Sequence, residues 1–364
     1  MGYMPSDSFD ITNIDHTLIS MSINDLDIHP RIIGSLKKGR FHSFETILSL
    51  SSADIERATG LSAGDVSILK QAVAEAVPKP PVVTALDLLR GSGSAVPIRK
   101  LSTGCPIIDK HLKGGILSRG ITEISGESAS GKTQLCLQLC LTSQLPPEHG
   151  GLGGGAVYVC TEDVFPNKRL HQVIQHFTRK WSPPRLQQDL ANLGDNIFVE
   201  HVAEREGLMF CVHKKIPILL AKGMVKLVVI DSVAALFRCE YGQGETVKRA
   251  KHMASFAAQL HKLGHQHNVP IVCVNQVSAN LSSNSSRSQV LPALGLSWAN
   301  HITCRLMLRR THKKVAVRVQ PASGGRQSDD IECAVRMLEV MFAPHLPPGA
   351  CAFVVDHQGV SGLE

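Results

Sequence analysis

The sequence lacks long hydrophobic runs and paired cysteines. No apolar segment reaches the roughly 18 residues of a membrane-spanning helix, and the N-terminal MGYMPSDSFDITN lacks the basic-then-apolar pattern of a signal peptide. The ten cysteines stand singly, without the CxxC spacing of a zinc site. These absences argue against a membrane partner, secretion, disulfides and cysteine-bound zinc, and they predict buried thiols in a reducing compartment.

The charge balance is only mildly positive. Lys and Arg number 38 and Asp and Glu number 31 in 364 residues, which gives a net charge of +7. This excess permits a polyanionic partner such as nucleic acid, but an ordinary basic globular protein has the same balance. The hydrophobic content of 43% predicts one sizeable core and one small extra domain.

The chain reads as four parts. We expect a flexible tail over residues 1–24. Apolar residues at helical spacing then predict a small all-α domain over 25–77, with four or five short helices. Within it, Ser62 and Asp65 form a capping-box pattern at the start of the last helix. A Pro-, Gly- and Ser-rich stretch at 78–97 predicts a linker over 78–100, and the remaining residues, 101–364, form the main domain.

The main domain has the pattern of an α/β fold. Short apolar runs alternate with helical segments at GITEIS (120–125), GAVYVCTE (155–162), NIFVEHV (196–202), KLVVIDS (226–232) and PIVCVNQV (270–277). Strands that are apolar on both faces predict a mostly parallel sheet covered by helices. After Asn300 the β-like runs follow closely, which predicts antiparallel strands that extend one edge of the sheet.

One octapeptide, GESASGKT, has the pattern of a phosphate-binding loop. Gly126, Gly131, Lys132 and Thr133 fit GxxxxGK[ST], directly after an apolar strand and before the helical TQLCLQLCLTSQL. Glycines let backbone N–H groups converge on a phosphate, and the N-terminus of the helix adds attraction. The pattern predicts ATP and Mg²⁺ binding by Gly126, Glu127, Ser128, Ala129, Ser130, Gly131, Lys132 and Thr133, with the Thr133 hydroxyl on the metal. The alternative is a glycine-rich turn that only caps a core helix.

Three polar residues follow other predicted strands. Asp231 ends LVVID and is predicted to hold Mg²⁺ through its water shell; the alternative is a helix N-cap. Glu162 ends VYVCTE and is the candidate base, whereas Gln276 ends IVCVNQ and is the candidate γ-phosphate sensor. Each of the last two also fits a satisfied polar residue at a strand end. Ligands of open α/β sheets bind at this edge, so we expect the three to lie together.

Five segments in order, STGCPIIDKHLKGGI, GITEISGESASGKTQLCLQL, VYVCTED, LVVIDSVAALFR and VPIVCVNQV, resemble the eukaryotic and archaeal branch of the RecA-type recombinase ATPase family. The resemblance runs from about Leu101 to the C-terminus, and the helical bundle is similar to the N-terminal domain of that branch. It implies a P-loop ATPase with Lys132, Glu162 and Gln276 as catalytic residues and Asp231 as the Walker B aspartate.

The resemblance also implies a cellular role. It is homologous recombination repair of broken DNA, beside the main recombinase filament and in a heterodimer with another paralogue, the C paralogue. Single-stranded or branched DNA is an implied partner. The implied location is the nucleus, with cytoplasm, and the mitochondrion is left open.

Two family loops that face DNA would fall at 238–251 and 278–292. The first keeps Arg238, Lys248, Arg249 and Lys251, which either contact phosphates or form a solvated helix face. The second has one arginine, Arg287, and no aromatic residue, so it offers little for phosphate neutralisation or base stacking. Its alternative is a disordered serine-rich loop.

Contacts between subunits also depart from the family pattern. Family linkers carry an aromatic-x-x-Ala hook, and here Val82 and Ala85 stand at its ends. Valine buries less apolar surface than phenylalanine, by roughly 1 kcal/mol or more, which puts self-polymerisation in doubt; the alternative has Val82 packing on its own domain. Phe342 replaces an acidic residue next to the predicted cap at 343–347. The basic stretch 309–327 either contacts DNA or an acidic partner, or forms a solvated hairpin.

Three functions fit these features. A strand-exchange recombinase is favoured by the complete set of ATPase groups, and a ring helicase shares the same core. We favour a third function, an ATP-gated subunit of a paralogue complex with a slow, DNA-stimulated ATPase, because the second loop and the linker hook depart from the recombinase pattern.

Overall fold

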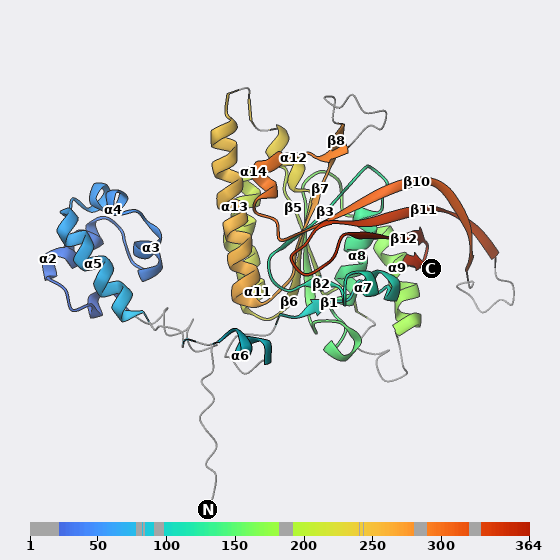
Figure 1. Cartoon of the computed structure of the whole chain (residues 1–364), viewed down its shortest axis with the longest axis horizontal. Coiled ribbons are helices and arrows are strands. Elements are labelled where there is room, and N and C mark those ends of the chain that lie inside the picture. Colours follow the sequence, from blue (N-terminus) through green and yellow to red (C-terminus); the bar gives the residue numbers. More distant parts are fainter. Residues whose placement is uncertain are drawn as a thin grey trace, which may run out of the picture. The chain divides into compact units, whose positions relative to one another are not determined.

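The computed structural model describes residues 22–77, 82, 84–90, 98–181, 192–239, 241–242, 244–279, 290–319 and 329–364. The chain divides into two compact units between Pro97 and Ile98 (Figure 1). Most of the tail predicted over 1–24 and part of the linker predicted over 78–100 lie outside the described residues. Each unit is described by itself.

The first unit is helical. A 3-10 turn, η1 (Ile23–Asp25), precedes the helices α2 (Pro30–Lys38), α3 (Phe44–Ser49), α4 (Ser52–Thr59) and α5 (Ala63–Ala76). Helices α3, α4 and α5 each begin after a serine whose hydroxyl accepts the backbone N–H three residues later. These helices enclose a core of their own, which includes Ile32, Leu36, Ile47, Ile55 and Leu69.

One more helix, α6 (Ala85–Arg90), lies within the predicted linker. Thr84 starts it with a reciprocal cap: the Thr84 hydroxyl accepts the Asp87 N–H at 3.1 Å, and the Asp87 carboxylate accepts the Thr84 N–H at 3.1 Å. The segment is therefore not coil throughout, although its composition predicted a linker.

The second unit is built on a sheet of nine strands among the described residues, in the order β13-β12-β11-β10-β3-β7-β6-β4-β5. The predicted parallel strands are all present: β3 (Ile121–Gly126), β4 (Gly155–Cys160), β5 (Ile197–His201), β6 (Val225–Asp231) and β7 (Ile271–Asn275). The α/β fold with a mostly parallel core is thereby confirmed.

The antiparallel edge is also present, with one difference. The strand β10 (Cys304–Val319) pairs parallel to β3 and antiparallel to β11 (Asp329–Phe342), followed by β12 (Gly349–Asp356) and β13 (Gly359–Leu363). The sequence predicted HITCRLMLRR and KKVAVRVQ as two separate β-like runs. They form one strand with a register shift between Arg310 and Lys314, so the polar residues between them mark a bulge and not a turn.

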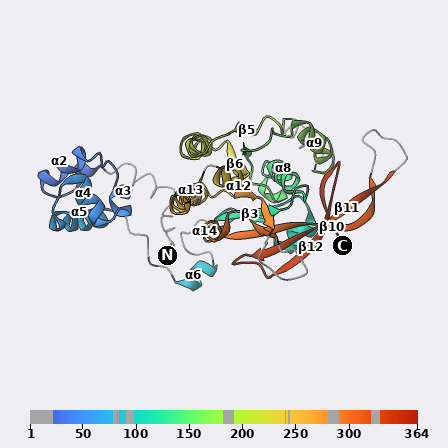
Figure 2. The same ribbon diagram turned by 90° about the horizontal axis from the view of Figure 1, so that it is seen from above.

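Helices cover both faces of the sheet. One face, which forms the first core, packs against α7 (Pro106–His111), α8 (Lys132–Thr142) and α9 (Asn167–Trp181). The other face forms the second core. It packs against α10 (Arg205–Phe210), a π turn (Cys211–Lys215), α11 (Ile216–Ala221), α12 (Val233–Cys239), α13 (Thr246–His267) and α14 (Gly295–Ala299). Figure 2 shows α8 and α9 on one side of the sheet and α13 on the other. Along β4, Tyr158 faces the first core, and its neighbours Val157 and Val159 face the second.

Short elements complete this unit. They are β1 (Lys100–Leu101) with β2 (Ile116–Leu117), η2 (Pro147–His149), and β8 (Val277–Ala279) with β9 (Val290–Pro292). The cysteines whose side chains are described are free, and all except Cys351 are buried. No described helix is both long enough and apolar enough to cross a bilayer.

Candidate nucleotide-binding site

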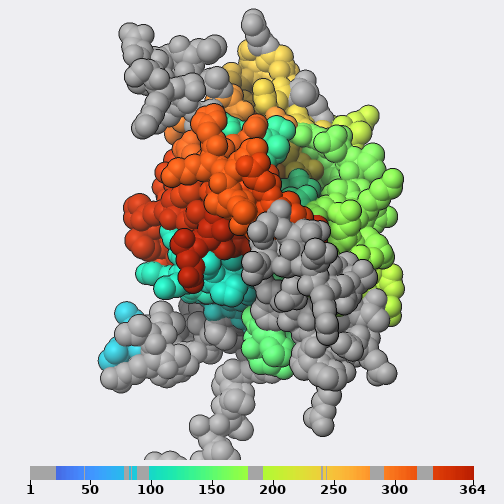
Figure 3. All heavy atoms as spheres, turned by 90° about the vertical axis from the view of Figure 1, so that its right-hand side faces the viewer, coloured from blue at the N-terminus to red at the C-terminus, as the bar shows by residue number. Residues whose placement is uncertain are grey.

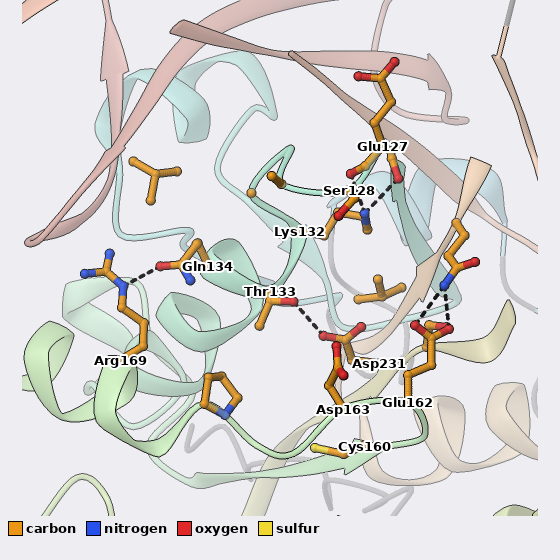
Figure 4. A pocket seen from close by; sticks show the side chains of 18 of the residues that line it. Glu127, Ser128, Lys132, Thr133, Gln134, Cys160, Glu162, Asp163, Arg169 and Asp231 are labelled. Carbon is orange, nitrogen blue, oxygen red and sulfur yellow. Dashed lines mark hydrogen bonds between the residues drawn. The ribbon is translucent and has the colours of Figure 1, made fainter. Parts of the chain in front are cut away.

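The phosphate loop follows β3, in the middle of the sheet. Gly126 lies so close to β10 that a Cβ would be 2.4 Å from the Leu308 carbonyl oxygen, and Gly131 adopts a φ of +104°. Both positions therefore require glycine. The ammonium of Lys132 donates to the carbonyl oxygens of Gly126 and Glu127, each at 2.7 Å (Figure 4). Burial lowers the pKa of Lys132, against the attraction of Asp231 and Glu162.

Two oxygen ligands meet beside this loop. The Thr133 hydroxyl donates to Asp231 Oδ2 at 3.0 Å, and the Tyr158 hydroxyl donates to the same oxygen at 2.5 Å. Burial raises the pKa of Asp231, and the hydrogen bonds from Tyr158 and Thr133 oppose this rise. The alternative role of Asp231 as an N-cap is not observed, because Ser232 Oγ accepts the Ala235 N–H instead. Hydroxyl and carboxylate oxygens are hard ligands, so this pair fits Mg²⁺.

The candidate base and the candidate sensor are in direct contact. The Gln276 amide donates to both carboxylate oxygens of Glu162, at 2.7 and 2.8 Å. Ser232 Oγ donates to Glu162 at 2.7 Å, and Arg238 donates to the side-chain oxygen Oε1 of Gln276 at 3.0 Å. Residues that follow β4, β6 and β7 are thus joined in one chain of hydrogen bonds.

A cavity of about 890 Å³ contains these groups. Figure 3 shows a hollow between the orange and red atoms of the antiparallel strands and the light-green atoms of α9. Seven of the eight phosphate-loop residues line the cavity; the exception is Ser130, which is buried and whose hydroxyl has no partner among the described residues. An unpaired buried hydroxyl, two obligatory glycines and the Thr133–Asp231 pair together fit a bound nucleotide with magnesium.

Sequence reasoning missed two arginines on the cavity wall. Arg169 Nε donates to Gln134 at 2.6 Å (Figure 4). The same guanidinium also donates to the Asp356 carbonyl oxygen. Arg336 Nε donates to the carbonyl oxygen of Ala129 in the phosphate loop at 3.3 Å. Arg169 follows β4 in CTEDVFPNKRL, which offered a weak signal. Arg336 lies on β11, 207 positions after Ala129, and no local sequence pattern indicates that it lines the cavity.

Comparison with known protein families matches residues 96–363 to Rad51. The chain belongs to the Rad51 family. It is 42% identical to the DNA repair protein XRCC3 of Bos taurus over 348 residues, which cover 94% of this chain and 98% of the relative. It is 30% identical to the DNA repair protein rhp57 of Schizosaccharomyces pombe over 323 residues, which cover 80% and 88%. These matches confirm the predicted resemblance to a RecA-type paralogue of DNA repair by recombination, with a nucleotide-binding ATPase fold.

The basic residues expected to face DNA do not share one site. Arg238 lies in the last turn of α12, and Lys248, Arg249 and Lys251 lie near the start of α13, so none is in a loop. Arg249 Nε donates to the Phe237 carbonyl oxygen at 2.7 Å, and Lys248 pairs with Glu245 at 3.0 Å. Arg238 and Arg249 also line a separate cavity of about 260 Å³. Arg287 lies outside the described residues.

The residues at the expected subunit contacts, and the basic stretch after Leu308, have the following surroundings in the structure. Val82 is fully exposed and Ala85 begins α6. Phe342 ends β11, and the Arg305 guanidinium lies 5.2 Å from its ring centre. In the basic stretch, Arg309 pairs with Glu339 and Lys314 with Glu332, both at 2.8 Å. Residues 320–328 of that stretch lie outside the described residues.

Proposed function

We propose that this chain is an ATP-binding subunit of a heterodimer of Rad51-family paralogues that acts in homologous recombination repair of DNA double-strand breaks. The observation that supports the proposal most is that three groups meet at the carboxyl ends of the parallel strands. They are the phosphate loop, the Thr133–Asp231 pair and the Glu162–Gln276 pair. Binding, metal and catalytic groups are then all present in one cavity.

Each group has a distinct role in this proposal. The loop amides and Lys132 would hold the phosphates of ATP, and Thr133 and Asp231 would hold Mg²⁺. Bound Mg·ATP would supply the phosphoryl group and the charge that neutralises it. Glu162 would orient a water and accept its proton at a carboxylate oxygen, while the Gln276 amide would register the γ-phosphate.

The Glu162–Gln276 contact supports a slow ATPase that DNA stimulates. The Gln276 amide occupies both oxygens of Glu162, so the amide must turn away before the carboxylate can bind a water in the same place. Arg238 holds the other end of that amide. A DNA phosphate that attracted Arg238 would loosen Gln276, and this supports single-stranded or branched DNA as the activating ligand.

The linker supports a heterodimer over a homofilament. Val82 is exposed and positioned ahead of α6, where it is free to dock on a partner subunit, but it offers less apolar surface than an aromatic residue. We therefore infer pairing with another paralogue, the C paralogue, and action on the main recombinase filament. The repair role agrees with a nuclear protein; presence in cytoplasm or mitochondrion is part of the proposal.

Mass photometry of the full chain tests the assembly. With ATP and single-stranded DNA, we expect monomers that associate only when the second paralogue is added, and Lys132→Ala should weaken that pair. Lys222→Ala, a change of an exposed lysine at the C-terminal end of α11, is the matched control. Long homofilaments would instead support a strand-exchange recombinase, which the complete ATPase groups also fit, and closed hexamers would support a ring helicase.

A further inference from the structure

A buried carboxylate lies close to the phosphate loop on the same strand. Glu123 of β3 precedes Gly126 by three residues, and its side chain is 0% exposed. It accepts hydrogen bonds from Asn275 Nδ2 at 2.6 Å and from Trp298 Nε1 at 3.0 Å, and it forms an ion pair with Arg305 Nε. Removing a carboxylate from water is costly, so three donors on one buried group indicate a tightly specified arrangement.

The three donors come from the two ends of one segment of the chain. Asn275 is the last residue of β7 and directly precedes Gln276. Arg305 lies near the start of β10, where the chain returns to the sheet beside β3. Trp298 lies between them in α14, on the described part of the returning segment. Glu123 therefore ties the departing strand, the returning helix and the returning strand to the strand that ends in the phosphate loop.

Surrounding contacts keep the donors in place. The Trp298 ring stacks on Phe256 of α13 with ring centres 6.2 Å apart, and the Arg305 guanidinium lies over Phe342. The Ala293 N–H donates to the Gln276 carbonyl oxygen at 2.9 Å, which fastens the returning segment to the sensor residue itself. Because Asn275 is held by Glu123, the backbone that carries Gln276 has a fixed position relative to Gly126.

We propose that Glu123 is a positioning residue for catalysis: it holds the Gln276–Glu162 pair at the correct place relative to the phosphate loop. This inference rests on the proposed ATPase activity. Glu123 is not among the residues that line the cavity, and its described side-chain partners are Asn275, Trp298 and Arg305 rather than phosphate-loop residues. Loss of its charge should therefore lower turnover and leave nucleotide affinity unchanged.

Two substitutions test the proposal in the full-length chain with its partner paralogue. Glu123→Gln keeps the shape of the side chain but removes the ion pair, and we expect kcat for phosphate release to fall about tenfold or more. The affinity for a fluorescent ATP analogue should stay within about twofold of wild type, because the groups that bind phosphate are untouched. Trp298→Phe replaces the indole with a smaller aromatic ring and removes one donor to Glu123, so it should give a smaller loss of kcat, about threefold. It also provides a test if Glu123→Gln does not fold.

The matched control is Glu339→Gln. Glu339 also pairs with an arginine of β10, Arg309, but at a partly exposed site on β11. Its substitution should leave both kcat and nucleotide affinity unchanged. Thermal unfolding of each variant separates lost protein from lost turnover, since activity is normalised to folded chain.

Three results would overturn the inference. One is wild-type turnover in both folded variants; another is a loss of nucleotide affinity that matches the loss of kcat, which indicates a purely structural role. In either case the wild-type chain still binds and cleaves ATP, so the Proposed function stands. A wild-type chain that binds no nucleotide contradicts the Proposed function, and the inference then fails with it.

Discussion

The carboxyl ends of the parallel strands and the start of α13 both contain charged residues that the sequence analysis singled out, yet these residues make different kinds of contact in the structure. At the strand ends, Lys132, Asp231 and Glu162 come from separate strands and meet in one cavity. On α12 and α13, by contrast, Arg238 and Arg249 bond to different internal partners. Ends of adjacent parallel strands are fixed by the sheet, whereas positive residues near one another in sequence have no such constraint.

The comparison teaches which signals predict a site. A phosphate-loop motif specifies the backbone conformation, because it requires glycines at two positions, a strand before the loop and a helix after it. A run of Lys and Arg specifies only the local charge, because each side chain can turn toward solvent, a carboxylate or a carbonyl oxygen. Substitutions at both places show whether this difference affects function.

Glu162→Gln should have the largest effect. An amide cannot accept the proton of an attacking water, so we expect phosphate release to fall by about 10²- to 10³-fold. Nucleotide affinity should change little, because Glu162 contacts Gln276 and Ser232 and not the phosphate loop. Single-turnover phosphate release and nucleotide titration measure the two quantities. Equal turnover by wild type and variant would contradict the role of Glu162 as base.

Gly126→Ala should destabilise the sheet unit by about 2–4 kcal/mol. The added Cβ would lie 2.4 Å from the Leu308 carbonyl oxygen, which belongs to the backbone and cannot turn aside. Chemical denaturation followed by circular dichroism measures the change. The control is Gly34→Ala in α2, where a Cβ has open space, and there we expect a gain of about 0.5–1 kcal/mol for the helical unit. Similar losses at both positions would contradict the close approach of β3 and β10.

Arg249→Ala should cost about 1–2 kcal/mol of unfolding free energy, because the Phe237 carbonyl oxygen loses a charged donor. Lys251→Ala, two positions later on an exposed surface, should stay within about 0.5 kcal/mol. The same pair tests DNA binding. If Lys251 contacts phosphate, its loss should reduce the slope of log affinity against log salt by about 1. An unchanged slope would mean that the start of α13 is a solvated face.

Cys160 should show the smallest effect, a chemical one. Burial is the main reason that the pKa of this thiol, which lines the nucleotide cavity, rises to about 12, and the charge of Asp231 adds to the rise. The thiolate is the reactive form, so alkylation of Cys160 should be slow at pH 8 and should accelerate about tenfold per pH unit below that pKa. Mass spectrometry of the peptide measures this rate, with Cys160→Ser as the blank. Rapid alkylation at pH 8 would show that the cavity wall is more open than described.

Much of the fold followed from the sequence because its signals are local. The parallel strands are short apolar runs, and the phosphate loop fixes the position of β3. The continuous strand β10 was divided in the prediction, because its polar residues at the bulge resemble a turn; in the structure β10 pairs with β11 on both sides of that bulge. Helix α6 was also missed, although Thr84 and Asp87 carry a capping pattern.

The site was predictable where a motif fixed the backbone and not where distant strands contribute. Lys132, Thr133 and Asp231 lie together as their strand positions implied. The contact of Gln276 with Glu162 spans the end of β6, which separates β7 from β4, and only the strand order reveals it. Arg336 enters from the antiparallel edge, where alternation of residues predicts a face but not the neighbour across it.

The helical unit and the sheet unit bury separate apolar clusters, which has a genetic consequence. Since the helical unit encloses its own apolar cluster, a missense change at Leu36 or Ile55 should unfold that unit and spare the ATPase unit. Damaging alleles should therefore form two classes, one that retains nucleotide binding and one that loses it. A cell that expresses one allele of each class would reveal whether the halves complement each other in trans.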